Sequence, residues 1–169
     1  MISIRKEEMN DYEAVHQLNL AAFENGPEAV IVDKLRTTCE NYLAFVAVEN
    51  DTVVGHILFT PITLKGCQSL GMGLAPMAVL PSHQRKGIGS LLVRHAIKHL
   101  TESGYTFIIV LGHPEYYPRF GFEPASNYKL TSQWEGVPDE AFMALVLNSK
   151  ALPKDGGVAK YHALFDKAM

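Results

Sequence analysis

The sequence has 169 residues, of which 47% are hydrophobic and 20% are charged, and its formal net charge is −3. This balance is typical of a globular chain, so we expect a single domain over residues 1–169 and exclude a collagen, a coiled coil and a disordered tail. Nucleic-acid-binding proteins usually carry a strong basic excess, and we therefore expect no nucleic-acid partner.

The cysteines and the apolar segments bear on where the chain works. Cys39 and Cys67 are too few for a disulfide framework or a four-sulfur zinc site, and two scattered thiols are typical of a reducing compartment, although a single bridge stays open. The first residues lack the apolar region of a signal peptide, and no apolar stretch approaches the roughly 18 residues of a membrane span. We expect a soluble cytoplasmic protein with no membrane partner.

Hydrophobic periodicity and turn residues predict five elements in the first part of the chain. They are a strand at Ile2–Lys6, helices at Asp11–Phe23 and Glu28–Cys39, and two strands at Leu43–Val48 and Thr52–Thr63. Asn25-Gly26-Pro27 separates the helices, and the turn Glu49-Asn50-Asp51 makes the two strands a hairpin. Pro61 predicts an edge or a bulge in the second strand, because proline cannot donate to a sheet.

The central segment predicts a βαβ unit. A strand at Leu74–Leu80 is followed by the loop Pro81–Gly89, a helix from Ser90 to about Glu102, and a nearly all-apolar strand at Tyr105–Leu111. This order requires the two strands to be parallel neighbours.

The rest of the chain is less clearly patterned. Two further strands are expected, at Phe120–Glu123 and Phe142–Leu147, and residues 151–169 form a weakly patterned tail. The expected fold class is α/β, with a mixed, largely antiparallel central sheet and a parallel βαβ core flanked by helices.

The loop before the central helix has the chemistry of an anion cradle. Its sequence is Gln84-Arg85-Lys86-Gly87-Ile88-Gly89-Ser90. Gly87 and Gly89 let backbone N–H groups approach phosphate oxygens, and the helix N-terminus adds free N–H groups and a positive dipole end. Two glycines alone would indicate only an easy strand-to-helix turn. With two cations beside them and a βαβ unit around them, they predict a pyrophosphate site, and their spacing excludes a Walker loop.

Two motifs resemble the Gcn5-related N-acetyltransferase superfamily. Gln84-Arg85-Lys86-Gly87-Ile88-Gly89 is similar to its Q/R-x-x-G-x-G/A signature. The segment from Leu111 to Phe122 resembles the L-G-D-P-x-Y-Y-x-R-F-G-F run of a subgroup of small bacterial predicted acetyltransferases, with His113 where aspartate is common. The resemblance implies the acyl-CoA N-acyltransferase fold, acetyl-CoA as cosubstrate and, as a family-level expectation, a homodimer.

The resemblance also implies which residues hold the coenzyme. The pyrophosphate is expected on the loop and first helical turn, that is on Arg85, Lys86, Gly87, Ile88, Gly89 and Ser90. The pantetheine arm is expected along a bulged strand, lined by Met77, Ala78 and Val79, and Pro76 is compatible with such a bulge.

A tyrosine four residues before the glycine of the Gly-Phe pair acts as general acid in the wider family, and this position is Tyr117. A phenol held near a departing thiolate can supply its proton. Packing is the alternative for Tyr117 and the interpretation that we favour for Tyr116. The expected oxyanion donor is a backbone N–H near Val79.

The resulting hypothesis is an acetyl-CoA-dependent N-acetyltransferase that passes the acetyl group directly to a primary amine of a small molecule or peptide. Neither cysteine has a convincing base beside it, which disfavours a covalent enzyme intermediate. The alternative is a non-catalytic acyl-CoA-binding sensor. Residues 1–85 hold six basic and ten acidic side chains, a net −4 that hints at a cationic amine, because this part builds most of the acceptor side in the family.

The base that accepts the amine proton is less defined by the sequence. His113 is the candidate near Tyr117 in the sequence, because histidine is the usual proton acceptor of this kind in enzymes, and a water chain is the alternative. Glu24 and Glu28 flank the helix break and are more typical of a solvated loop acid and a first-turn helix acid, while His56 is more typical of a core histidine.

One pair of histidines has a spacing that can bind zinc. His95 and His99 are four residues apart on the central helix, and a stoichiometric zinc would support a hydrolase. The glutamate of H-E-x-x-H is absent and Lys98 lies beside the pair, so we expect no metal.

Overall fold

The computed structural model describes residues 1–168. Within this range the chain forms nine strands, which join into one sheet. The strands are β1 (Ile2–Lys6), β2 (Leu43–Glu49), β3 (Thr52–Leu64), β4 (Cys67–Val79), β5 (Phe107–Leu111), β6 (Glu123–Pro124), β7 (Leu130–Ser132), β8 (Phe142–Val146) and β9 (Gly157–Lys160). The α-helices of the same range are α1 (Tyr12–Ala22), α2 (Glu28–Thr38) and α3 (Ile88–Glu102).

The sheet is mixed and largely antiparallel, as the sequence predicted. Its main path runs β1-β2-β3-β4-β5-β8-β6, and β9 joins the far end of β3 while pairing with β7. β4 and β5 are parallel neighbours connected through α3, so the predicted βαβ unit is confirmed. The bulge predicted at Pro61 is also confirmed, because the β3–β4 register shifts between Pro61 and Thr63.

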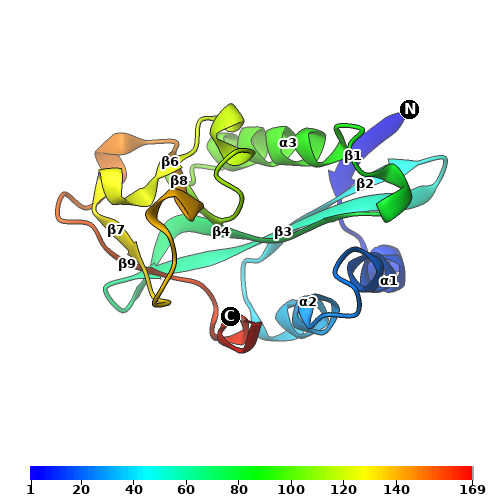
Figure 1. Ribbon diagram of the computed structural model, residues 1–169, viewed down its shortest axis with the longest axis horizontal. Helices are drawn as coiled ribbons and strands as arrows, with labels where there is room; N and C mark the ends of the chain where they lie inside the picture. Colours follow the sequence, from blue (N-terminus) through cyan, green and yellow to red (C-terminus); the bar gives the residue numbers. More distant parts are fainter. Residues whose placement is uncertain (169) are drawn as a thin grey trace.

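The helices cover opposite faces of the sheet (Figure 1). α3 lies on one face, whereas α1 and α2 lie together on the other, close to the C-terminal end of the described chain. Each face has its own apolar core. Ile57 and Phe59 of β3 belong to the core under α3, and the alternating residues Leu58 and Ile62 belong to the core under α1 and α2.

Three predictions about strands need correction. β4 begins at Cys67 rather than at Leu74. The strand expected at Phe120–Glu123 is wrong, because Tyr117–Phe120 form a 3₁₀ turn that ends on Gly121 at a φ of 103°. In this segment only the two-residue strand β6 pairs with β8, on the side that β5 does not occupy. The short strands β7 and β9 were not predicted, since they are too short to show a periodicity and pair with remote segments.

The early part of β4 was missed because its glycines weaken the strand pattern. In the fold, aromatic rings from distant segments cross the strand at these glycines. A Cβ atom on Gly71 would overlap the ring of Phe107, and one on Gly73 would overlap the ring of Tyr161. The glycines therefore make room for contacts that a local sequence pattern does not contain.

A buried ion pair fixes α2 to the end of β1. Arg36 on α2 donates to Glu7 Oε1 at 2.6 Å, and their side chains are only 6% and 2% exposed. Burial alone would raise the pKa of Glu7, but the nearby His56 imidazole and the hydrogen bonds from Arg36 outweigh it, so this pKa lies below its ordinary value. Separating such a pair would leave a charge buried without a partner, so the position of α2 is strongly specified.

The structure bears on two further expectations, the absence of a membrane-spanning helix and the state of the two cysteines. Among them, no helix combines the length and the apolar character that crossing a bilayer requires. Cys39 and Cys67 are both free thiols, so the single bridge left open by the sequence does not form in this structure.

Candidate active site

β4 and β5 separate halfway along their length. They pair from Gly71–Leu74 against Phe107–Val110, and beyond this point β4 continues to Val79 with only β3 beside it. An extra β4 residue at Ala75-Pro76 shifts the β3–β4 register, so the bulge predicted there is confirmed. The edge of β4 that faces away from β3 is thus free of a strand partner from Ala75 to Val79, and an extended ligand can pair with it.

The loop before α3 presents a row of unpaired backbone N–H groups. Within residues 1–168, no N–H group from Arg85 to Ser90 donates a hydrogen bond to another residue. The loop is shaped by Arg85 and Gly87, whose φ angles are 63° and 83°, and it is tied to the end of β4 by Gln84 Nε2, which donates to the Val79 carbonyl at 3.0 Å. A helix N-terminus with free N–H groups can bind an anion without further rearrangement.

The side chains of the bulged strand alternate between two environments. Met77 and Val79 are half-buried and line hollows beside the loop. Ala78 is buried and faces the other way, in register with His56 of β3. Because strand side chains alternate, Ala78 offers a ligand in this groove its backbone and not its side chain.

Tyr117 lies at the split between the strands. Its ring is buried and passes over Gly112, where a Cβ atom would lie 2.5 Å from the ring atom Cε2. Its hydroxyl donates no hydrogen bond to the described chain, and it lines the cavity at the split. Burial, helped by the neighbouring Tyr116, raises the pKa of Tyr117 well above its ordinary value of 10. Tyr117 is therefore a protonated donor over the whole physiological range.

Tyr116 has a role that the sequence did not suggest. Its ring packs against the apolar core under α3, and its hydroxyl also reaches the start of this helix, where it lies 3.0 Å from Ser90 Oγ. It also sits against Gly89, since a Cβ atom there would lie 3.2 Å from the Tyr116 hydroxyl. Tyr116 therefore forms a wall between the anion loop and the split.

Arg119 is a second residue that the sequence analysis missed. Its guanidinium lies over the Tyr116 ring at 4.4 Å, and its Nε donates to the Tyr116 carbonyl at 2.9 Å. Its terminal nitrogens form no hydrogen bond to the described chain, and the residue lines the same hollows as Arg85. The available signal was its place in the Tyr-Pro-Arg-Phe-Gly-Phe run, in which the sequence analysis considered only the tyrosine.

Three adjoining hollows form a groove from the start of α3 to the split. They have volumes of about 330, 800 and 430 Å³. Tyr116 lines all three, and Met77 and His113 line both the middle hollow and the cavity at the split. Gly87, Ile88, Gly89 and Ser90 line the end at α3, whereas Lys86 is exposed and lines none of the three.

Of the acidic residues and histidines considered as the general base, two line the cavity at the split and two lie elsewhere. Glu28, in the first turn of α2, lines the cavity at the split, so it is more than the solvated helix acid that we expected. Exposed Glu24 does not line it. His113 is exposed at the junction of two hollows. His56 is fully buried, with Nε2 3.4 Å from Glu7 Oε1, as a core histidine would be.

The histidine pair on α3 has a packing contact of its own. His95 and His99 both place their rings edge-on against Phe45, with centroids 4.9 and 5.3 Å away. Across residues 1–168, no group of three or more side chains of metal-binding type lies close enough to hold an ion.

Comparisons with known proteins agree with this geometry. The model of the acetyltransferase (GNAT) family matches residues 5–122. An uncharacterised N-acetyltransferase of Escherichia coli K12, YhbS, is 33% identical over 165 residues, which cover 97% of this chain and 98% of YhbS.

Two solved structures are also similar. The crystal structure of E. coli YhbS in complex with CoA has a TM-score of 0.90 at 32% identity and covers 98% of this chain and 92% of its own. A GNAT-family acetyltransferase from Brucella melitensis, in complex with acetyl-CoA, has a TM-score of 0.82 at 34% identity and covers 98% of this chain and 99% of its own.

Proposed function

Because the chain belongs to the acetyltransferase (GNAT) family, we propose that it transfers the acetyl group of acetyl-coenzyme A to a primary amine by direct attack within a ternary complex. The observation that carries this proposal is the row of unpaired N–H groups at the start of α3, which opens through one groove onto the split between β4 and β5. The CoA and acetyl-CoA complexes of the two similar structures support the same occupant.

The α3 end of the groove fits a pyrophosphate. The N–H groups of Gly87, Ile88, Gly89 and Ser90 converge at a positive helix terminus, and phosphate oxygens satisfy such groups without any side chain. Arg85 lies beside them, and a planar guanidinium can bind phosphate oxygens through two nitrogens.

Arg119 adds a second cation from the other side of the groove. Its stacking on Tyr116 and its bond to the Tyr116 carbonyl fix the guanidinium before any ligand arrives, so little conformational entropy is lost on binding. The position of Lys86, outside the three hollows, gives it only a long-range attraction for the coenzyme.

The free edge of β4 fits the pantetheine arm. Its amides can pair with the backbone between Ala75 and Val79, as an added strand would, with Met77 and Val79 providing apolar contact. This pairing leads the arm toward the cavity at the split, where Tyr117 lies.

Bound acetyl-CoA supplies a thioester, whose acetyl carbon is open to attack by a neutral amine. The amine nitrogen forms a bond to that carbon, the carbon–sulfur bond breaks, the sulfur gains one proton, and the nitrogen loses one. Tyr117 is the donor to sulfur, because its hydroxyl is protonated and free of other partners.

His113 accepts the proton from nitrogen. It lines the mouth of the cavity and exchanges with solvent, so it can release that proton after each turnover. A backbone N–H near Val79 stabilises the negative charge that develops on the carbonyl oxygen.

Two measurements test the proposal. Calorimetry with CoA should give binding, and release of free thiol from acetyl-CoA should require both the enzyme and an amine. Absence of CoA binding would contradict the coenzyme site. Binding without thiol release for any amine in a broad panel would instead favour an acyl-CoA sensor.

A further inference from the structure

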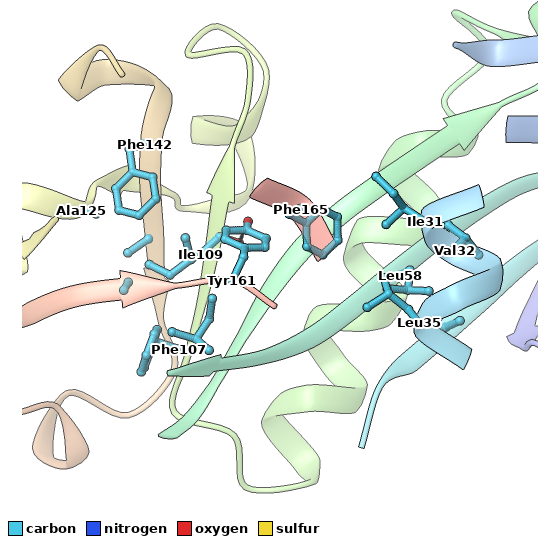
Figure 2. Close-up of a cluster of buried hydrophobic side chains, with 14 of the residues drawn as sticks. Ile31, Val32, Leu35, Leu58, Phe107, Ile109, Ala125, Phe142, Tyr161 and Phe165 are labelled. Carbon is cyan, nitrogen blue, oxygen red and sulfur yellow. Dashed lines mark hydrogen bonds between the residues drawn. The ribbon is translucent and has the colours of Figure 1, made fainter. Parts of the chain in front are cut away.

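The wall of the cavity opposite the split is built by the C-terminal segment. Phe165 is buried and lines the cavity together with Phe23 and Ile31 from the α1–α2 side. Figure 2 shows Phe165 between Tyr161 and Ile31, and its ring meets that of Tyr161 edge-on with centroids 5.4 Å apart. An aromatic and aliphatic surface therefore faces the place where the acetyl group is delivered.

Tyr161 fixes this segment at the point where the strands separate. Its buried hydroxyl lies 3.1 Å from the Leu74 carbonyl and 3.0 Å from the Ile109 carbonyl, one on each strand. Burial, with Tyr117 nearby, raises the pKa of Tyr161, so the hydroxyl keeps the proton that it donates to these carbonyls.

Hydrogen bonds with Gln133 and Trp134 also hold the C-terminal segment in place. Asp166 Oδ1 accepts from Trp134 Nε1 at 3.0 Å and from Gln133 Nε2 at 3.1 Å. The oxygen of the Gln133 amide accepts from the Tyr161 N–H at 2.7 Å. Phe165 lies between these two fixed points and is therefore a rigid wall, suited to selecting a ligand by shape.

The cavity at the split also carries a charge, which is negative because of Glu28. Glu28 lines it, and the Glu28 carboxylate forms no ion pair or hydrogen bond with the residues 1–168. No lysine or arginine of the described residues lines the cavity, and His113 at the mouth is its remaining basic group. An ammonium group finds a partner in this cavity, whereas a carboxylate is repelled by Glu28 and finds no fixed cation.

We propose that the acceptor is a primary amine with a bulky apolar group close to its nitrogen and no carboxylate on the same carbon. Phe165 and Glu28 determine this specificity. Glu28 attracts the ammonium form, and the nitrogen attacks once it has lost its proton. This inference rests on the proposed acetyl transfer and adds the class of acceptor.

A panel of matched amines tests the acceptor class. Turnover would be measured as thiol release with phenethylamine, phenylalanine amide, phenylalanine, glycinamide and spermidine. The two apolar amines should exceed glycinamide in kcat/KM by roughly 10- to 100-fold, because burial of a phenyl group contributes on that scale. Phenylalanine should fall well below its amide. A tripeptide with N-terminal phenylalanine then tells whether the amine belongs to a free molecule or a peptide.

Two variants connect the panel to the residues. Phe165→Ala should lower the kcat/KM ratio of phenethylamine to glycinamide through KM, and Phe165→Leu should restore most of it. Glu28→Gln should reduce the preference for phenylalanine amide over phenylalanine, whereas Glu24→Gln, an exposed acid outside the cavity, should not.

The outcomes separate this inference from the proposed function. Highest activity with spermidine, glycinamide or phenylalanine would overturn the acceptor class and leave acetyl transfer intact. So would unchanged ratios in correctly folded Phe165→Ala and Glu28→Gln, with folding checked by thermal unfolding. If the wild-type chain did not bind CoA, that result would instead contradict the coenzyme site.

Discussion

The two ends of the groove are built in different ways. The backbone groups of the coenzyme end come from one continuous segment, from the β4 bulge at Pro76 to Ser90 in the first turn of α3, and only Tyr116 and Arg119 are added to them from the turn after β5. The acceptor end is assembled from side chains that are far apart in the sequence: Phe23 just after α1, Glu28 and Ile31 of α2, and Phe165 of the C-terminal segment. These elements lie on the face of the sheet opposite α3 (Figure 1). The first end suits a constant ligand, whereas the second can change its preference through single side chains.

This contrast is consistent with what each ligand requires. A diphosphate is recognised by N–H groups that every residue except proline carries, so only the space around them is set by sequence. Amines differ in shape and charge, and only side chains can distinguish them. Changes at the coenzyme end should therefore weaken binding of every substrate pair, and changes at the acceptor end should shift the choice between amines.

The largest effect is expected at Gly89. In Gly89→Val the branched side chain presses on Tyr116 and closes the approach to the N–H groups. Affinity for CoA should fall by at least about 100-fold, because hydrogen bonds to charged groups contribute roughly 1.5–3 kcal/mol each. Calorimetry measures this, with Gly89→Ala as the control, since one methyl group requires only a small shift of Tyr116. Equal affinity in Gly89→Val would exclude the backbone site.

Tyr117→Phe should act on turnover instead of affinity. Loss of the proton donor should lower kcat by about 100-fold, with little change in the affinity for CoA. Because burial raises the pKa of Tyr117, the alkaline fall in the wild-type rate that Tyr117 causes should lie above pH 10. Steady-state kinetics with saturating amine provide the test, and an unchanged kcat would remove Tyr117 from the mechanism.

Arg119→Gln tests how much a side-chain cation contributes to CoA binding at the coenzyme end. Removal of this exposed cation should weaken CoA binding by about 10-fold at low salt, and the difference should shrink as salt is added. Arg94→Gln is the matched control, because Arg94 stacks on Phe120 at 5.0 Å without lining the groove. Titrations in parallel would contradict the role of Arg119 if both variants bound CoA equally well.

The smallest effect concerns the junction between the two ends. Tyr161→Phe removes the hydroxyl that bonds to Leu74 and Ile109, and it should lower the free energy of unfolding by about 1 kcal/mol. Urea unfolding measures this change, and the affinity for CoA should stay the same. Tyr105→Phe is a control, because the Tyr105 hydroxyl has no hydrogen-bond partner in residues 1–168. Equal stability of the two variants would mean that Tyr161 acts by packing alone.

The same contrast explains how far the sequence could predict the site. The βαβ unit and the glycine loop before α3 are encoded in consecutive residues, so pattern and spacing were sufficient to predict them, whereas the β4 bulge was expected from the family resemblance. The contact between the Tyr116 hydroxyl and Ser90 was not predicted, because it depends on the 3₁₀ turn that begins after Tyr116 and on residues far apart in the sequence. Phe165 and Glu28 belong to no sequence motif. They line the same cavity because the Tyr161 ring packs against Gly73 and because the Arg36–Glu7 ion pair holds α2 in place. Long-range packing of this kind leaves no local pattern in the sequence.

In the proposed complex, backbone N–H groups at the start of α3 hold the coenzyme diphosphate. NMR of the ¹⁵N-labelled chain during a titration with CoA observes these groups one by one. We expect the amide signals of Gly87, Gly89 and Ser90 to shift strongly and to saturate together with the binding measured by calorimetry. Saturable binding of CoA that leaves these three amides unmoved would contradict it.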